Sequence, residues 1–192
     1  MEFTSIILLA VLAVVLIYFV MIYNQLVQVK HNVSKAWANI DVLLKQRHDE
    51  LPKLVETCKQ YMKFEQETLT KVMEARAGVS QAREQRNVPA LGQAEGDLRN
   101  ALGRLFALAE AYPDLKTNQT FLQLQTRISS LENAIADRRE FYNESVNINN
   151  VRIEQFPDSI VAGLFSFKPF ALLKFSEAEK ADVQMKELFQ AS

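Results

Sequence analysis

Hydrophobic residues fall into three successive patterns along this chain. Residues Phe3 to Tyr23 form an apolar run that contains no charged residue, glycine or proline. From Val33 to Val72, and again along the last long helix from Phe121 to Asn149, a stripe of mostly apolar residues recurs at alternating spacings of three and four, which is typical of helices packed against other helices. A dense apolar stretch, Ile160 to Phe175, follows. The patterns predict an all-α protein: an N-terminal transmembrane helix, an antiparallel helical bundle with shallow, coiled-coil-like crossings, and a short apolar C-terminal segment with a terminal helix.

The first apolar run is long enough to be a membrane anchor. About 20 residues at about 1.5 Å per residue cross a hydrocarbon core about 30 Å thick. A secretory signal has a positively charged start and a small-residue cleavage site, whereas here Glu2 precedes the run and bulky residues end it. We therefore interpret the run as a retained anchor. The residues expected to define its membrane contact are Phe3, Ile6, Leu12, Leu16, Phe19 and Tyr23.

The charges that flank the anchor bear on its direction. Lys30 and Lys35 follow the run, and no Lys or Arg precedes it. The positive-inside rule then favours a cytoplasmic domain. We place the anchor at residues 1–23, the bundle at 24–155 and the C-terminal segment at 156–192.

Pro52 interrupts the helical pattern of the bundle. Proline is tolerated in the first turn of a helix, and Asp49 just before it is a suitable N-cap. One helix then ends near His48 and another begins at Asp49, which gives four long helices and is the arrangement we favour. The alternative is a single long helix that kinks at this point, which gives three.

Two further breaks are expected. The segment Asn87 to Pro89 ends the next helix, because a residue before proline is pushed out of helical conformation. Tyr112 to Asp114 forms a tight turn, after which Thr117 or Asn118 caps the last long helix. The helix between these breaks carries interleaved small residues, which indicate either close approach of a neighbouring helix or flexibility: Ala94, Gly96, Ala101 and Gly103.

The last long helix becomes polar in its second half, where its pattern expects more hydrophobic residues. One interpretation is a surface-facing end or a hydrogen-bonded cluster that fixes the helix register. The other is a site for a ligand or partner. The candidate polar cluster, with charged residues from earlier helices, is Asp41, Arg47, Arg76, Glu110, Arg138, Arg139, Tyr142 and Asn143.

The C-terminal apolar stretch is too hydrophobic for a solvated tail. It caps the bundle, meets a partner or lies in the membrane interface. With four antiparallel helices it returns to the bilayer, where aromatic residues insert and lysines meet headgroups. The candidate partner or membrane contacts are Phe165, Phe167, Lys168, Phe170 and Phe175. Ser176 to Phe189 is expected to form the terminal helix.

The composition limits which kinds of binding or catalytic site this chain can form. Lys and Arg total 22 against 23 Asp and Glu, so the basic excess typical of nucleic-acid binding is missing. Cys58 is the only cysteine, which excludes an internal disulfide, and we expect it to be a buried core residue. Neither His31 nor His48 follows a glutamate by three residues, as di-metal bundles require. We expect no catalytic residue, metal or cofactor.

Short segments with a specific order and spacing are distributed over nearly the whole chain: Tyr23–Val27, Ala36–Asp41, Leu51–Glu56, Ala75–Arg76, Glu110–Lys116, Phe121–Gln125, Leu131–Asn133, Tyr142–Asn143 and Phe156–Pro157. In these segments the sequence resembles the LemA family. The resemblance implies a bacterial single-pass membrane protein with an antiparallel helical bundle. Some members of the family carry a lipoprotein-type cysteine in place of the anchor, which implies a bundle outside the cytoplasm, so both sides of the inner membrane stay open.

Two functions remain. The first is a non-enzymatic, membrane-anchored scaffold or interaction module that contacts the lipid bilayer and an unidentified protein. The alternative is an enzyme or a metal- or ligand-binding bundle that uses a buried carboxylate and arginine cluster. Homo-oligomerisation is possible but has no particular support, because the anchor lacks small-residue dimer spacing apart from Ala10 and Ala13.

Overall fold

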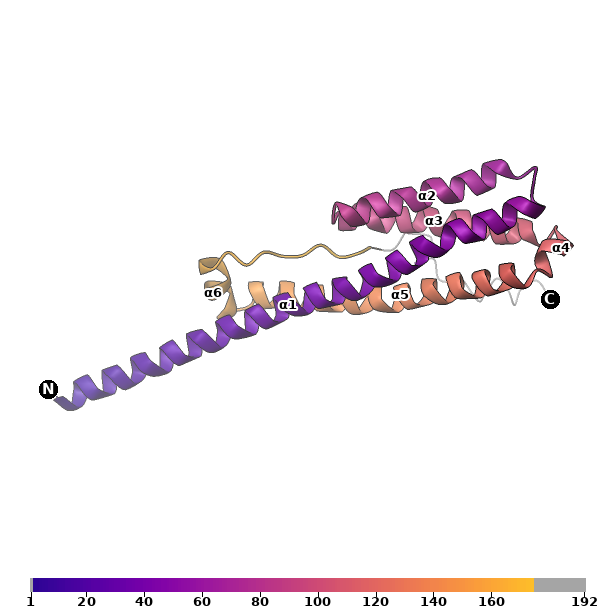
Figure 1. Cartoon of the computed structure of the whole chain (residues 1–192). Coiled ribbons are helices and arrows are strands. Elements are labelled where there is room, and N and C mark those ends of the chain that lie inside the picture. The colour runs from indigo at the N-terminus through magenta and orange to yellow at the C-terminus, as the bar shows by residue number, and fades with distance from the viewer. Residues whose placement is uncertain (1, 175–192) are drawn as a thin grey trace, which may run out of the picture. The chain divides into compact units, whose positions relative to one another are not determined.

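The computed structural model describes residues 2–174, and within that range the chain is helical without strands. This confirms the all-α class. A non-helical segment, 165–174, ends the described chain and runs as an extended trace (Figure 1). The predicted helix at Ser176–Phe189 lies outside the described residues. The helices are α1 (Glu2–Tyr61), α2 (Gln66–Glu84), α3 (Val88–Ala109), α4 (Pro113–Lys116), α5 (Gln119–Glu154) and α6 (Asp158–Leu164).

Four of these helices are long, as favoured, but the first turn of the bundle is not where the sequence placed it. α1 continues through Pro52 and ends at Tyr61, and the chain turns at Met62–Glu65. The expected break at Asp49–Pro52 is therefore wrong. Proline inside a helix leaves the carbonyl four residues earlier, that of His48, without its usual donor. Here Arg76 Nε of α2 donates to that carbonyl at 2.9 Å, which satisfies it from a neighbouring helix.

Contacts within the chain divide it into two units. The first comprises Met1–Ile40 and Arg138–Leu172, and the second comprises Asp41–Asp137 and Leu173–Ser192. α1 and α5 therefore each contribute residues to both units.

The second unit is an antiparallel helical bundle. Along α1 and α2, Arg83 contacts Asp41 whereas Arg76 contacts His48, so residue numbers fall on one helix as they rise on the other. α2 and α3 lie side by side (Figure 1). The core residues recur at the predicted spacing and include Leu44, Leu51, Leu54, Cys58, Leu69, Val72, Leu91, Leu98, Leu102, Leu105, Ile128 and Ile135.

Two asparagines cap the helices of this unit. Asn87 Oδ1 accepts a hydrogen bond from the backbone N–H of Ala90 at 3.1 Å, which caps α3. Asn118 Oδ1 accepts from the N–H of Phe121 at 3.0 Å, at the start of α5. Both breaks that the sequence placed before these helices are confirmed, with the short α4 in place of a simple turn at Pro113.

Glycine has a positional role at Gly92 of α3. A Cβ atom there would lie 2.6 Å from the backbone oxygen of Lys174, too close for any side chain. A Cβ atom on Gly78 of α2 would lie 3.9 Å from the Cβ atom of Ala94 in α3, whereas one on Gly103 would meet nothing within 4 Å. The small residues of α3 thus admit the C-terminal segment as well as a neighbouring helix.

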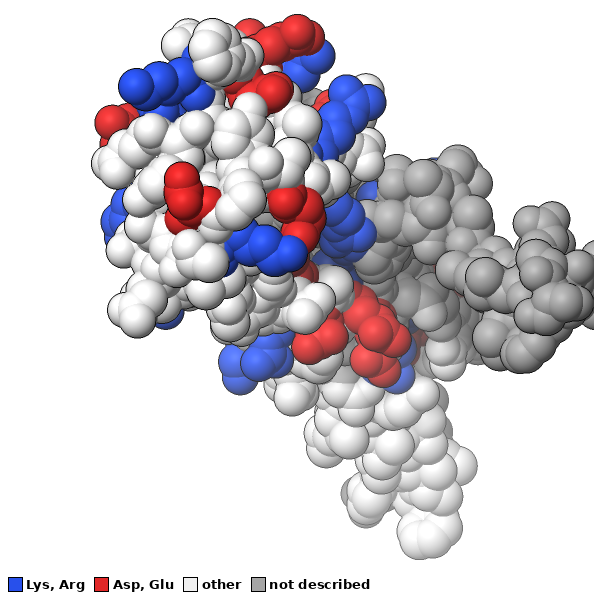
Figure 2. Space-filling view, turned by 90° about the vertical axis from the view of Figure 1, so that its right-hand side faces the viewer, with Lys and Arg blue, Asp and Glu red and all other residues white. Residues whose placement is uncertain are grey.

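The surface drawn in Figure 2 carries both signs of charge. Lys and Arg alternate with Asp and Glu over that face, and neither sign gathers into a continuous patch.

Candidate interaction site

The apolar run occupies the first part of α1 and is almost entirely exposed. An 18-residue window there has a mean hydropathy of 3.1, and 6% of it is buried. α1 is thus long and apolar enough to cross a membrane. Four of the six predicted anchor residues are more than half exposed: Phe3, Ile6, Leu12 and Leu16. Phe19 and Tyr23 instead contact aromatic rings of the C-terminal segment.

The core of the first unit is built where the apolar run ends. Ile22 and Leu26 of α1 pack with Val161 and Ala162 of α6, and all four side chains are buried. Phe165 adds an aromatic contact, with its ring centroid 4.6 Å from that of Tyr23. The structure therefore joins the C-terminal apolar stretch to the end of the predicted anchor.

Asn150 holds the extended segment by its backbone. Its Oδ1 accepts from the N–H of Phe170 at 3.0 Å, and its Nδ2 donates to the carbonyl of Phe170, also at 3.0 Å. Buried Asn149 donates to the same Oδ1 at 3.2 Å and so orients the amide. One side chain thereby satisfies both backbone groups of Phe170, as a neighbouring strand would.

Tyr142 fixes the same segment further along. Its hydroxyl donates to the carbonyl of Ala171 at 3.0 Å, and its ring meets that of Trp37 on α1 edge to face, 5.7 Å between centroids. Burial raises the pKa of the Tyr142 hydroxyl, which keeps it a donor at neutral pH. Tyr142 and Asn150, both in the polar half of α5, thus bind the backbone of the chain's own C-terminal segment.

Arg152 links three helices of the first unit. Its Nε lies 2.7 Å from Oδ2 of buried Asp158 at the start of α6, and its guanidinium also contacts Gln25 of α1. A carboxylate in the first turn is favourable to a helix, and the arginine compensates its burial. This contact sets α6 against α1.

A buried ion cluster lies in the second unit. Arg47 of α1 pairs with Glu95 of α3, and its Nη1 lies 3.7 Å from Glu132 of α5. Arg47 and Glu95 are 3% and 6% exposed, so neither charge has bulk water to stabilise it. Burial raises the pKa of the Glu132 carboxyl, against the opposing effect of Arg47. The contacts of Arg47 therefore connect α1 with α3 and α5.

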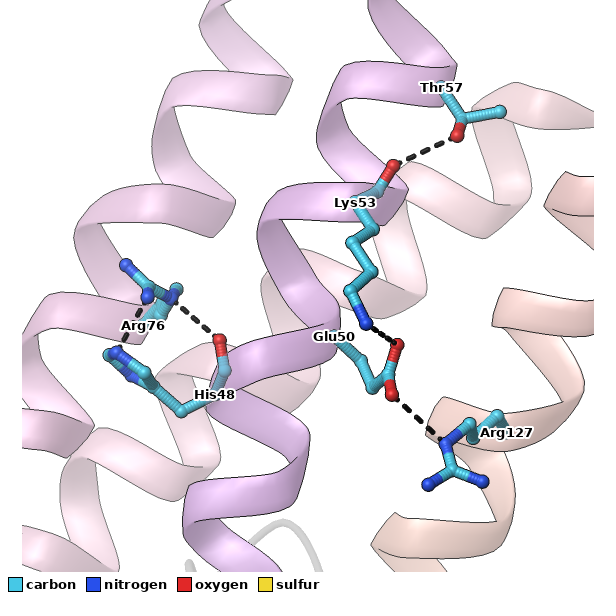
Figure 3. A network of polar contacts seen from close by, with 6 residues as sticks. All are labelled: His48, Glu50, Lys53, Thr57, Arg76 and Arg127. Carbon is cyan, nitrogen blue, oxygen red and sulfur yellow. Dashed lines mark hydrogen bonds and ion pairs between the residues drawn. The ribbon is translucent and has the colours of Figure 1, made fainter.

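A second polar network surrounds Pro52. Figure 3 shows Arg76 reaching from α2 to both the carbonyl and the ring of His48, with Nη2 2.6 Å from Nε2. Burial, and then the charge of Arg76, lower the pKa of His48, which favours the neutral ring as acceptor. In the same view Glu50 accepts from Lys53 and from Arg127 of α5, each at 3.1 Å. These two hydrogen bonds lower the pKa of Glu50, that from Lys53 most.

The structure assigns the remaining predicted residues to different contacts. Asp41 pairs with Arg83, whereas Glu110 pairs with Lys116 on the surface. Arg138 is exposed and Arg139 is buried. Each charged member of the predicted polar cluster that has a described partner is thus paired with a different residue. Asn143 is half-buried.

The predicted C-terminal contacts also differ from one another. Phe165 and Lys168 are exposed, whereas Phe167 and Phe170 are half-buried against their own chain. Phe175 lies outside the described residues. Cys58 is a buried free thiol, and burial raises its pKa to about 12, so the nucleophilic thiolate is scarce at neutral pH. Within residues 2–174, no group of three or more His, Cys, Asp or Glu residues is placed to hold a metal.

Sequence reasoning missed the partners of Arg47. Glu95 stands on the apolar stripe of α3, between Leu91 and Leu98, and Arg47 stands between Leu44 and Leu51 on that of α1. A charge on an apolar stripe signals a buried pair, and two such charges of opposite sign could have been matched. Nothing in the spacing shows that Asn150 binds backbone.

Comparison with known proteins decides the family. The LemA family model matches residues 36–186. The chain belongs to the LemA family. Protein LemA of Metamycoplasma hominis is 31% identical over 181 residues, which cover 93% of this chain and 81% of that protein.

Similarity extends to proteins with another name. Magnetosome protein MamQ 2 of Paramagnetospirillum magneticum is 34% identical over 101 residues, 53% of this chain and 37% of that protein. Magnetosome protein MamQ of Magnetospirillum gryphiswaldense is 33% identical over 101 residues, with the same coverage. The match thus spans little more than a third of the MamQ proteins.

Proposed function

We propose that this LemA-family chain is a single-pass membrane protein whose helical bundle serves as a non-enzymatic scaffold for a protein partner. The observation that carries the proposal is α1 itself. One uninterrupted helix, Glu2–Tyr61, contains both the exposed apolar window and residues of both units.

The exposure of the window supports a membrane span. A core helix of a soluble protein buries its apolar residues, whereas this window is 6% buried. The core of the first unit supports retention of the span. Cleavage of the apolar run from the chain would also remove Ile22, and with it the contacts of Ile22 with Val161 and Ala162. We infer that the run is an anchor rather than a cleaved signal.

The inner membrane of a bacterium is the proposed location. Lys30 and Lys35 after the span favour a cytoplasmic bundle. A reporter fused to the C-terminus that is active only outside the cytoplasm, such as alkaline phosphatase, tests the direction. Strong phosphatase activity would contradict the cytoplasmic side and leave the scaffold proposal intact.

Phe64 is the residue we propose as a partner contact. It lies in the turn between α1 and α2 and is 94% exposed, the highest value among the exposed large hydrophobic residues of residues 3–174. Aromatic residues are enriched at the centres of protein interfaces. A groove between α2 and α3, of about 580 Å³, opens among Thr68, Gly78 and Asn100 and offers a second surface in the same unit.

Site-specific photocrosslinking in cells tests the scaffold. Benzoylphenylalanine replaces Phe64, Asn100 or, as a control, the exposed Ser129 of α5. We expect a discrete protein adduct from Phe64 or Asn100 and none from Ser129. Adducts of equal strength from all three positions, or from none, would contradict a defined partner surface.

An enzyme or metal carrier is the alternative. Its supporting observation is the raised pKa of Glu132 in a cluster with Arg47 and Glu95, since shifted carboxyls occur at functional sites. Direct pairing with Arg47 also accounts for that cluster as a structural network. Metal analysis of the purified chain would favour the alternative if it found stoichiometric metal that is lost in a Glu132→Gln variant.

A further inference from the structure

A groove of about 520 Å³ lies in the first unit beside the end of the apolar run. One wall is formed by Tyr23, Val27, Lys30 and His31 of α1, and the other by the segment Phe165–Phe170. Asn150 fixes the backbone of that segment at Phe170, so the second wall is anchored to α5. The groove is therefore part of the folded unit.

The lining of the groove combines positive charge with aromatic rings. Lys30 and Lys168 contribute two formal charges, His31 adds a further nitrogen donor, and no lining residue is acidic. The ammonium group of Lys30 lies 5.9 Å from the ring centroid of Phe167. Such a site attracts an anion and offers apolar surface next to it.

The position of the groove along α1 matches the headgroup layer. If Phe3 to Ile22 spans the hydrocarbon core of about 30 Å, Tyr23 lies at its edge and Lys30 about 10 Å beyond it along the axis. Side chains of a helix tilt toward its N-terminus, so the ammonium of Lys30 points back toward the membrane surface. Tyr at this depth is typical of the interface.

We propose that this juxtamembrane groove binds the headgroup of an anionic phospholipid. The phosphate lies between Lys30 and Lys168, and the acyl chains follow the exposed side chains of Leu164 and Phe165 toward the apolar run. Phe165 is in contact with Phe19 and Tyr23, which makes the apolar surface continuous from groove to anchor. The inference rests on the membrane anchor of the proposed function.

Native mass spectrometry of the full chain in a non-ionic detergent tests the proposal. Phosphatidylglycerol and phosphatidylcholine with the same acyl chains compete for the protein, and glycerol 3-phosphate alone forms a third arm. The test variant is Lys30→Gln with Lys168→Gln. The matched control is Lys35→Gln with Lys45→Gln, which removes two exposed lysines of α1 outside the groove.

We expect the wild type and the control to retain phosphatidylglycerol over phosphatidylcholine. A lysine near an anionic headgroup increases the affinity for the lipid about fivefold. The groove variant lacks two such lysines, so its affinity for phosphatidylglycerol should fall about 30-fold. Equal retention of the two lipids, or equal loss in both double variants, would overturn the proposal. Binding of glycerol 3-phosphate without lipid preference would also overturn it, because the source would then be a soluble anion.

Alkaline carbonate extraction of cell membranes separates this inference from the proposed function. Release of the wild type by carbonate would show that the anchor itself has failed. A groove variant that stays in the membrane pellet, keeps its helical circular dichroism and still prefers phosphatidylglycerol would contradict the groove alone.

Discussion

The effect of Pro52 on the free energy of unfolding should depend on Arg76. This dependence is measurable as an interaction energy between the two positions. Proline at 52 leaves the carbonyl of His48 without a donor from its own helix, and Arg76 Nε supplies one at 2.9 Å. The perturbations are Pro52→Ala, which restores a helical N–H, and Arg76→Met, which removes the donor but keeps an apolar stem. We expect the two changes to be non-additive.

The size of the effect follows from the contacts. A hydrogen bond from a charged donor contributes about 1.5–3 kcal/mol to stability. Arg76 is half-buried, so water can donate to the His48 carbonyl in part when the arginine is removed. Arg76→Met should therefore lower the free energy of unfolding by about 1–2 kcal/mol. Alanine is favoured over proline inside a helix by about 3 kcal/mol, reduced by lost packing and by the greater freedom of the unfolded chain. In the Pro52→Ala background the new backbone N–H donates to His48, so the cost of Arg76→Met should fall by about 1 kcal/mol.

Urea unfolding of the full chain in detergent, followed by helical circular dichroism, measures the four free energies of the cycle. Arg83→Met is the matched control, because Arg83 also belongs to α2 but contacts the side chain of Asp41, at 3.8 Å. It should be additive with Pro52→Ala. An interaction energy between positions 52 and 76 below about 0.5 kcal/mol, the usual limit of additivity, would refute the role assigned to Arg76.

Three other predictions follow from single contacts. Asn150→Ala should speed hydrogen exchange at the backbone amide of Phe170 about tenfold, because a hydrogen bond that contributes about 1.4 kcal/mol is lost. Asn147→Ala, at an exposed position, should leave this exchange rate unchanged. Arg47→Met should lower the free energy of unfolding by about 3–5 kcal/mol, because it leaves a buried carboxylate without its positive partner. Glu132→Gln should be neutral or stabilising at pH 7. Equal losses of stability in the two variants would contradict the ion cluster. The pKa of His48 is lowered in the fold from 6.5, so its stabilising effect is present above pH 6.5 and is lost as pH falls through the folded pKa; His48→Gln should flatten the stability profile in that window, and an unchanged profile would contradict the neutral ring.

The helices of the second unit were predictable because their signals are local. The apolar stripe from Val33 to Val72 and the asparagine caps at 87 and 118 each depend on neighbours a few residues away. The path of α1 through Pro52 was not predictable in this way. The donor to the His48 carbonyl is an arginine 24 positions after the proline, and only the packing of α2 on α1 brings that donor to the carbonyl.

The candidate site residues were also hard to predict, because their roles depend on contacts with distant parts of the chain. The sequence identified an unusual polar half of α5 but could not tell a ligand site from an internal one, because the partner of Asn150 is backbone, which any sequence supplies. Phe64 was missed because its exposure follows from the turn at Met62–Glu65, and the sequence had placed the turn at Pro52. An error in one helix end thus hid the most exposed aromatic residue of the described chain.

The C-terminal apolar stretch combines two roles that a deletion would confuse. Val161 and Ala162 belong to the core with Ile22, so removal of the whole stretch would unfold the first unit whatever its surface binds. Ile160 and Leu164 are 60% and 69% exposed on the opposite face of α6, and their side chains can be changed without opening that core.

Ile160→Ser with Leu164→Ser is therefore the informative variant for this surface. If the face lies against the bilayer, the variant should keep its fold and its membrane location, while a lipid-soluble spin label or a brominated lipid should no longer reach Phe165 beside it. If the face binds protein instead, crosslinked adducts should disappear while lipid contact stays unchanged. An unchanged result in both assays would show that the exposed face of α6 contacts neither, and would contradict the path proposed for the acyl chains along Leu164.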